Sequence, residues 1–353
     1  MGELRKFPTV ELVGVLECAG NGRGFYQPGV TGLQWTHGAA GNARWRGVRL
    51  AEVLKKAALK PSAKHMLFNG ADTPPGTMPD FTRTVPMQKA LDPDTLLAFE
   101  MNGETLPVSH GYPLRLIVPG WAGDSWVKWI TSIEAIDKEH DGFFMKTAYR
   151  YPIRPVAPGA TVDASEMRPV EALRPKSVII GPRNGARGIH GVAWAGESPV
   201  VRVDVSTDGG QRWRPAKLGR DRARYAWRLW ELIWTRDNPG SDVVMARATD
   251  AAGATQPLIQ QWNPSGYLWN VVQPVNLKSS GAPLQPLRET PPFPPKVTQA
   301  CIGCHESDII AGQRLSRAQW DREVNKMTGW GAIVNPADRN EILDFLIERF
   351  GPR

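Results

Sequence analysis

A proline-rich stretch near residue 290 constrains the folding of this chain more than any other feature. Its sequence, PLQPLRETPPFPPK, runs from Pro283 to Lys296. Proline removes backbone N–H donors and favours extended polyproline II, so the stretch predicts a semi-rigid spacer. A proline-rich loop packed along a domain surface is the alternative interpretation. Either way, the stretch separates a short C-terminal tail from the main body of the chain.

The first part of the main body, residues 1–160, mixes short apolar runs with Gly and Pro turns. The runs VELVGVLEC and PLRLIVPG predict buried strands, because they are short, rich in aliphatic residues and stopped by Gly or Pro. Residues Arg49–Ala57 have apolar residues at helical spacing. We therefore expect a mixed α+β domain over residues 1–160.

The second part, residues 161–277, has the pattern of an all-β domain. In VVRVDVSTDGGQRW, Val201, Val203 and Val205 alternate with polar residues before an Asp-Gly-Gly turn signal. The run YAWRLWELIW can place Trp227, Leu229 and Ile233 on one face of a strand. Several short strands with turn signals predict a β-sandwich.

The tail, residues 299–353, is predicted to be a small all-α domain that follows a linker over residues 278–298. The run ADRNEILDFLIERF places Ile342, Phe345, Leu346 and Phe350 on one helical stripe. Asn335 before Pro336 is a helix start signal. A tail of this size buries little apolar surface, so a stable fold requires an additional covalent link or a bound metal.

The motif CIGCH indicates such a stabilising group. Its residues Cys301, Cys304 and His305 have the spacing of a c-type haem attachment site. Zinc would require two more Cys or His ligands, and neither residue type follows His305. A redox dithiol would be expected in a thioredoxin-like βαβ context, which is absent. The haem iron also needs a sixth ligand, and Met327 is the only methionine after the motif. The alternative role for Met327 is core packing.

The charge pattern and hydropathy of the sequence argue against several classes of protein. The net charge is +8, but no run of five or six like charges occurs, so we do not expect nucleic-acid binding. No apolar run approaches the roughly 20 residues of a transmembrane helix, and the N-terminus lacks the apolar core of a signal peptide. Three cysteines cannot form a disulfide framework. Cys18 is thus an unpaired cysteine, which by itself would most often be a small buried hydrophobe.

The surroundings of Cys18 give it another interpretation. The segment ECAGNGR resembles a motif of the sulfite oxidase family, and the block from Gly70 to Ile130 resembles the next part of that family. The segments GVAWAGESPVVRVDVSTDGGQRW and AWRLWELIW resemble its second, immunoglobulin-like dimerisation domain. The resemblance covers about residues 8–277, and the tail is similar to a class I monohaem cytochrome c.

The resemblance implies a molybdenum-molybdopterin cofactor, with the Cys18 thiolate as a ligand of the metal. A soft thiolate suits this metal. The residues implied to bind the cofactor are Asn21, Asp72, His110, Arg115 and Lys128. The residues implied to act on the substrate, together with Cys18, are Arg23, Tyr149 and Trp35. Arginine binds small oxyanions through bidentate hydrogen bonds, whereas Trp35 and Tyr149 could instead be core aromatics.

The sequence departs from the family pattern in three places. The family has a stretch before residue 1, with an asparagine–histidine motif and an arginine, so we expect a truncated or late-assigned start. Gly22 precedes Arg23 where the animal enzymes carry a second arginine, and Ala148 precedes Tyr149 where they carry aspartate. These differences bring the chain nearer to bacterial relatives, including the molybdenum subunit of sulfur-oxidising systems.

The resemblance and the haem motif together predict oxidation of sulfite to sulfate, with electrons passed to the tethered haem c and then to an external cytochrome c. A sulfane-sulfur dehydrogenase or a sulfoxide reductase on the same scaffold is the alternative, and a non-catalytic electron-transfer subunit is a third. The second domain suggests a homodimer. C-type haem is normally attached outside the cytoplasm, so we expect a periplasmic protein.

Overall fold

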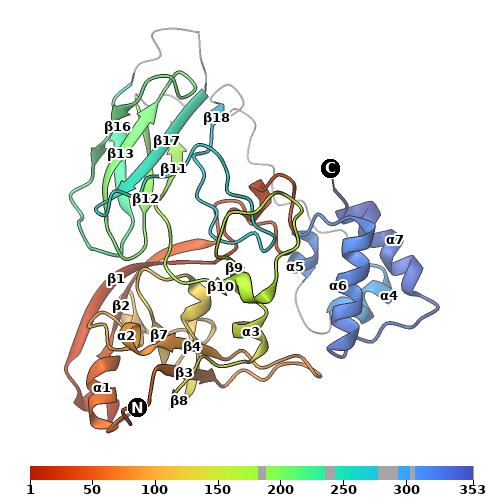
Figure 1. Cartoon of the computed structure of the whole chain (residues 1–353), viewed down its shortest axis with the longest axis horizontal. Helices are drawn as coiled ribbons and strands as arrows, with labels where there is room; N and C mark the ends of the chain where they lie inside the picture. The colour runs from red at the N-terminus through yellow and green to blue at the C-terminus, as the bar shows by residue number, and fades with distance from the viewer. Residues whose placement is uncertain (182–187, 235–242, 277–292, 303–306, 353) are drawn as a thin grey trace.

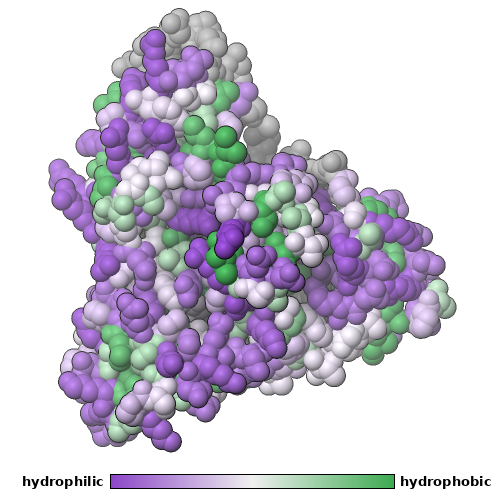
Figure 2. All heavy atoms as spheres, in the orientation of Figure 1, coloured by the Kyte–Doolittle hydropathy of each residue, from purple (hydrophilic) through white to green (hydrophobic). Residues whose placement is uncertain are grey.

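The chain folds into two lobes built on β-sheets and one helical lobe (Figure 1). The computed structural model describes residues 1–181, 188–234, 243–276, 293–302 and 307–352. Within these ranges, no helix combines the length and apolarity that a bilayer crossing requires. The face shown in Figure 2 is largely hydrophilic, with apolar residues in small groups.

The first lobe contains two sheets and a short ribbon. One sheet has the order β1-β2-β5-β6, with β7 also paired to β5, and the other has the order β4-β3-β8. The strands are β1 (Thr9–Glu17), β2 (Ala40–Arg49), β3 (His65–Gly70), β4 (Arg83–Pro86), β5 (Leu96–Met101), β6 (Glu104–Thr105), β7 (Arg115–Ile117) and β8 (Ile130–Ile136), and the ribbon pairs β9 (Arg150–Pro152) with β10 (Met167–Pro169).

The helices of this lobe are short. They are α1 (Leu50–Lys56), α2 (Met87–Ala90) and α3 (Phe143–Lys146), with single 3₁₀ turns η1 (Leu4–Lys6), η2 (Arg23–Phe25), η3 (Val108–His110), η4 (Gly123–Ser125) and η5 (Ala164–Glu166). The predicted strands and helix of this region are confirmed: all of VELVGVLEC except Cys18 lies in β1, PLRLIVPG contains β7, and α1 buries Leu50 and Leu54. The strands of both sheets are short, with alternating or fully apolar sequences. Their buried side chains pack together in one cluster, which is the core of the lobe.

The second lobe is a β-sandwich of two four-stranded sheets, with orders β11-β12-β16-β15 and β14-β13-β17-β18. Its strands are β11 (Lys176–Gly181), β12 (Ile189–Trp194), β13 (Val200–Ser206), β14 (Arg214–Pro215), β15 (Lys217–Leu218), β16 (Arg228–Leu232), β17 (Val243–Asp250) and β18 (Val275–Asn276). The expected all-β second domain is therefore present.

Two details of the predicted strand faces are wrong. A register shift between Val200 and Arg202 interrupts the alternation in β13, so Val203 and Val205 are buried whereas Val201 is 51% exposed. In β16 the buried residue is Trp230, and the face predicted to be apolar carries Leu229 and Ile233 at 62% and 83% exposure. Periodicity identifies two faces of a strand but does not say which one meets the core.

The third lobe is the predicted helical tail. Its helices are α4 (Pro295–Val297), the π-helical turn η7 (Thr298–Ile302), α5 (Ser307–Ala311), α6 (Arg317–Gly329) and α7 (Arg339–Phe350). The predicted stripe is confirmed for Ile342, Leu346 and Phe350, which are buried, with Phe345 partly buried beside them. Helix α7 begins at Arg339, later than predicted, because the Asn335 side chain instead accepts the Ala337 N–H in a turn.

The end of the expected linker belongs to this helical lobe. Phe293 packs on Phe345, with ring centroids 5.8 Å apart, and α4 begins at Pro295. Proline at the first position of a helix loses no hydrogen bond, so the same residue type that predicts a spacer also starts a helix here. The rest of the predicted linker lies outside the described residues.

The first two lobes are joined around the C-terminal end of β1. Val15 and Ala19 pack with Val192 and Trp194 of the sandwich in one buried cluster. Gly14 bridges Tyr225, and the Val15 N–H donates to the Tyr225 carbonyl at 2.9 Å. The loop that follows β1 is therefore fixed from both lobes.

Candidate functional site

Cys18 is the first residue after β1, in a loop held by backbone hydrogen bonds. Its N–H donates to the Ala39 carbonyl and its carbonyl accepts the Asn21 N–H, both at 2.9 Å. Burial raises the pKa of the Cys18 thiol, while the Gly20 N–H and the charge of Arg23 act in the opposite direction. The groups that favour a thiolate are thus in place, but they do not outweigh burial without a further positive charge at the sulfur.

A buried network behind the loop fixes its position. Glu17 accepts hydrogen bonds from Asn21 Nδ2 at 2.8 Å and Trp194 Nε1 at 2.7 Å, and it pairs with Lys176. Asn21 Oδ1 also accepts the Ala39 N–H at 3.2 Å. The Asn21 side chain, expected to bind the cofactor, therefore also holds the Cys18 loop.

Arg23 is a buried cation with no carboxylate partner among the described residues. It is 8% exposed, and its guanidinium donates only to the carbonyls of Leu33 at 3.2 Å and Ser265 at 3.4 Å. Its Nε has no hydrogen-bond partner. Burying an unpaired charge is costly, so this arrangement fits a site that receives an anion.

Tyr149 lies close to the same point. Its ring stacks on Tyr267 at 5.6 Å, and the Arg23 guanidinium lies over that same Tyr267 ring at 5.0 Å. Tyr149 has a positive φ of 53°, a left-handed conformation that costs about 1 kcal/mol for a non-glycine residue. Burial, with the negative potential of Tyr267, Asp124 and Cys18, raises the pKa of Tyr149. The hydroxyl therefore stays protonated and can donate a hydrogen bond.

A buried ion pair lies behind Tyr149. Arg83 Nη2 contacts Asp124 Oδ2 at 2.6 Å, and the Arg83 guanidinium also lies over the Tyr149 ring at 5.3 Å. Burial raises the pKa of Asp124 to about 6, in spite of the pairing with Arg83. Several buried polar atoms here have no partner in the protein: Asp124 Oδ1, Arg83 Nε, Thr84 Oγ1 and Ser125 Oγ. Buried polar atoms are normally hydrogen-bonded, so these four indicate room for a bound group or water.

Trp35 is placed differently from the expectation that it lines an anion pocket. Its side chain is 41% exposed, and its described contact with the site is through the backbone, where its carbonyl accepts the Gly24 N–H at 3.0 Å. The loop is therefore close to Arg23, and the indole is partly exposed to solvent. The small space beside Cys18, about 10 Å³, is bordered instead by Arg174, Lys176, Leu268 and Trp269.

The residues expected to bind a phosphate gather at a second point of the first lobe. Arg115 Nη1 donates to the His110 carbonyl at 3.0 Å, and Lys128 Nζ donates to the Ser109 carbonyl at 3.0 Å. Burial lowers the pKa of Arg115 to about 10, and burial together with Arg115 lowers the pKa of Lys128. Asp72 is near enough to oppose the lowering of the Lys128 pKa. Two crowded cations with little negative charge between them fit an anionic group such as a phosphate.

No group of three or more His, Cys, Asp and Glu side chains suited to a metal occurs in the described part of the chain. A metal held by Cys18 would therefore take its other ligands from a bound cofactor. The single cysteine sulfur, the unpartnered polar atoms and the crowded cations Arg115 and Lys128 all fit a molybdopterin that carries its own metal ligands.

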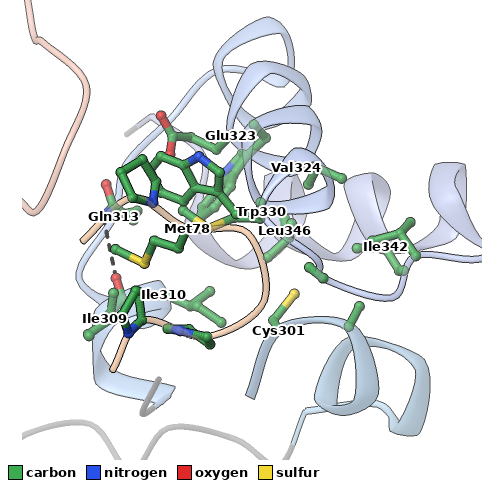
Figure 3. Close-up of a pocket in the computed structure, with 18 of the residues that line it drawn as sticks. Met78, Cys301, Ile309, Ile310, Gln313, Glu323, Val324, Trp330, Ile342 and Leu346 are labelled. Atoms are coloured by element: carbon green, nitrogen blue, oxygen red, sulfur yellow. Dashed lines mark hydrogen bonds between the residues drawn. The ribbon is translucent and has the colours of Figure 1, made fainter. Parts of the chain in front are cut away.

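The helical lobe has a separate cavity of about 450 Å³. Cys301 and Met327 line it, together with apolar residues of α5, α6 and α7. Burial raises the pKa of Cys301 to about 11. Figure 3 shows the Cys301 sulfur directed into the space that Met78 and Trp330 border. Cys304 and His305, the other predicted haem residues, lie outside the described residues.

Comparison with known proteins identifies the first two lobes. Residues 1–144 match the oxidoreductase molybdopterin binding domain, and residues 169–279 match the Mo-co oxidoreductase dimerisation domain. Sulfite oxidase of Arabidopsis thaliana is 33% identical in an alignment of 298 residues that covers 75% of this chain and 75% of that protein. The chain belongs to the sulfite oxidase family.

Other members of the sulfite oxidase family extend this comparison. Mitochondrial sulfite oxidases of Drosophila melanogaster and Homo sapiens are 35% and 36% identical and match 78% and 76% of the chain. The chain spans about half the length of these animal relatives. The sulfane dehydrogenase SoxCD from Paracoccus pantotrophus is 32% identical, with a TM-score of 0.65, over 77% of this chain and 70% of that one.

Family membership agrees with the molybdopterin cofactor that the sequence predicts, and it leaves the predicted roles of individual residues as predictions. Five further residues border the site and were not predicted from the sequence: Glu17, Lys176, Arg83, Asp124 and Tyr267. Glu17 carried a signal, because it is a charged residue directly after the apolar run LVGVL that would bury it. Lys176 and Tyr267 carried none, since only the packing of the second lobe brings them to Cys18.

Proposed function

We propose that this protein oxidises sulfite to sulfate at a molybdenum-molybdopterin centre held by Cys18. The balanced reaction is sulfite plus water giving sulfate, two protons and two electrons, with the electrons passed to haem c in the tail and then to an external cytochrome c. The observation that carries the proposal is the buried, carboxylate-free guanidinium of Arg23 in the same loop as Cys18. A small oxyanion supplies the missing negative charge.

The chain's own residues bind, orient and protect the reactants. When bound, the molybdenum cofactor supplies a two-electron centre able to exchange an oxygen atom. Arg23 attracts the oxyanion, and Tyr149 keeps its proton and donates a hydrogen bond at the same point. Glu17 and Asn21 hold the cysteine loop in place. His110, Arg115, Lys128 and Asp72 are the residues that would hold the phosphate and pterin.

The helical tail supports electron export. Its cavity of about 450 Å³ is lined by Cys301, one of the two predicted thioether cysteines, and by Met327, the predicted axial ligand. When bound, haem c supplies a one-electron acceptor in this cavity. A haem tethered to the oxidising domain is present at high effective concentration, which favours fast internal transfer.

The test is sulfite-dependent reduction of the haem in molybdenum-loaded, full-length protein. We expect the visible haem bands to shift to the reduced form within seconds of sulfite addition, and not after sulfate addition. The haem is assayed beforehand as the pyridine haemochrome and molybdenum by mass spectrometry. A loaded protein whose haem stays oxidised would refute sulfite oxidation, and absent molybdenum would favour a non-catalytic subunit.

A second candidate is sulfane-sulfur oxidation, because the SoxCD structure is described as a sulfane dehydrogenase and matches this chain at 32% identity. The same haem assay, with protein-bound sulfane or thiosulfate in place of sulfite, distinguishes the two. Haem reduction by sulfane and not by sulfite would favour this candidate. Haem oxidation by a sulfoxide would instead favour the reductase alternative.

Assembly and location follow as proposals. The dimerisation domain and the exposed apolar residues Ile180, Leu229 and Ile233 on the sandwich support a homodimer. Light scattering of wild type and of an Ile233→Lys variant tests it, since a monomeric wild type would refute the proposal. Covalent haem attachment supports a periplasmic protein, which fractionation of the native host tests.

A further inference from the structure

The cavity of the tail is open toward the first lobe, and a segment of that lobe completes it. Besides the tail residues, the cavity is lined by Asp72, Pro74, Met78 and Phe81, which lie between β3 and β4. In Figure 3 Met78 comes from the first-lobe segment and lies among Trp330, Gln313 and Ile310 of the tail. The cavity is thus shared between two lobes that are more than 200 residues apart in the sequence.

Backbone contacts fasten this segment to the turn after α6. The Thr77 N–H donates to the Trp330 carbonyl at 3.1 Å, and Thr77 Oγ1 donates to the Gly329 carbonyl at 2.8 Å. Gly76 has a φ of +56°, and a Cβ at this position would lie 2.3 Å from the Trp330 oxygen. Both the conformation and the close approach require glycine. The contact is therefore specific in geometry and is not a chance touching of side chains.

The same segment reaches the Cys18 site at its other end. Phe81 lines the cavity, and its ring contacts Phe144 at 4.9 Å and Tyr149 at 6.1 Å between centroids. A second line of rings joins Trp330, which also lines the cavity, to Phe143 at 5.6 Å and from there to Phe144 at 5.1 Å. Burial raises the pKa of Tyr149 and Cys18 adds to the effect, as it does for the neighbouring Tyr267, so both rings lie near the sulfur. Packed aromatic side chains thus join the cavity to the surroundings of Cys18.

We propose that residues 72–81 are the docking element between the two redox sites: Gly76 and Thr77 fasten the tail, Met78 closes the haem cavity, and Phe81 joins the cavity to Tyr149. This inference rests on the proposed haem attachment. Closure by an apolar side chain excludes water from the haem, and burial is one of the factors that set a haem potential. Water stabilises the more charged ferric state, so closure raises the reduction potential of the haem.

The test compares Gly76→Val with Gly41→Val in haem-loaded, full-length protein. Gly41 is exposed in β2, and a Cβ added there would have nothing within 4 Å, so this variant controls for the added side chain. We expect Gly76→Val to keep its haem content and to bind imidazole at the iron at least tenfold more tightly. We also expect the reduction potential of its haem to fall by about 59 mV. For a one-electron couple, this is a tenfold change in the equilibrium constant for reduction. Gly41→Val should match wild type in both.

A milder variant and a haem-independent measurement complete the test. Met78→Ala leaves the backbone contacts in place. It should raise the affinity of the haem iron for imidazole, and it should lower the reduction potential of the haem by less than Gly76→Val does. Hydrogen exchange should show the Thr77 amide protected in wild type and exchanging at least tenfold faster in Gly76→Val. Unchanged imidazole affinity in both variants, or an unprotected Thr77 amide in wild type, overturns the proposal. A wild type without covalent haem refutes haem attachment, and Thr77 exchange still reports on docking.

Discussion

Cys18 and Cys301 are both half-buried thiols with raised pKa values, yet their surroundings are built in opposite ways. Around Cys18 the buried groups are charged or polar, with Arg23, Glu17 and Asp124 nearby, and the space beside the sulfur is about 10 Å³. Around Cys301 the wall is mostly apolar and the space is about 450 Å³. The first site positions charged and polar groups around the sulfur, whereas the second can hold a large flat group away from water.

Burial has different consequences at the two sites. At Cys18 the position of the loop depends on the buried ion pair between Glu17 and Lys176 and on the hydrogen bond from Asn21 to Glu17. At Cys301 the wall depends on packing and on a segment supplied by another lobe. Substitutions should therefore act through charge at the first site and through solvent access and ligation at the second.

The largest effect is expected from Cys18→Ser. A hydroxyl is a poor ligand for a soft metal, so haem reduction by sulfite should fall by at least ~10³-fold while the haem spectrum stays intact. Stopped-flow absorbance with sulfite measures the rate, and mass spectrometry measures molybdenum. Surviving haem reduction would show that Cys18 is not the metal's anchor, and that the metal is held by other residues.

Glu17→Gln should destabilise the first two lobes strongly, because it leaves Lys176 buried without its carboxylate. Removing one partner of a buried ion pair typically costs about 3–5 kcal/mol. Differential scanning calorimetry should show a lower Tm for these lobes. Glu231→Gln, which breaks the exposed pair with Lys217, is the matched control and should leave Tm unchanged. Equal Tm values for both variants would contradict a structural role for the Glu17 network.

Arg23→Met should lower kcat/KM for sulfite by about 10- to 100-fold, because a hydrogen bond to a charged group contributes about 1.5–3 kcal/mol. The main change should be a higher KM, with the haem spectrum and the molybdenum content unaffected. Arg44→Met removes an exposed arginine of β2 and serves as the control. An unchanged KM in Arg23→Met would mean that the oxyanion binds elsewhere.

Met327→Leu should leave the haem covalently attached and remove its sixth ligand. A methionine ligand raises the potential, so the potential should fall by more than about 59 mV, and the near-infrared methionine–iron band should disappear. Met245→Leu in the sandwich is the control. If the band persists in Met327→Leu and disappears in Met78→Leu, the axial ligand comes from the first lobe instead.

Some elements of the fold could be predicted from the sequence and others could not. Strand β1, helix α1 and the buried stripe of α7 were predictable, because local apolar periodicity determines them. The outward face of β16, with Leu229 and Ile233 exposed, was not, since a period of two is the same for either orientation. The bulge that exposes Val201 depends on the pairing with β17, which periodicity does not report.

By itself, the sequence determined the lobes, the cysteine loop with Arg23, and the CIGCH motif, because each is written in consecutive residues whose chemistry is local. Only the tertiary structure decided what surrounds them. It brings Lys176 and Tyr267 to the Cys18 loop and places Met78 and Phe81 in the wall of a cavity in the tail. Such contacts join residues far apart in the chain. They exist because charges and apolar surfaces buried together must be satisfied by whichever segments the fold places next to them.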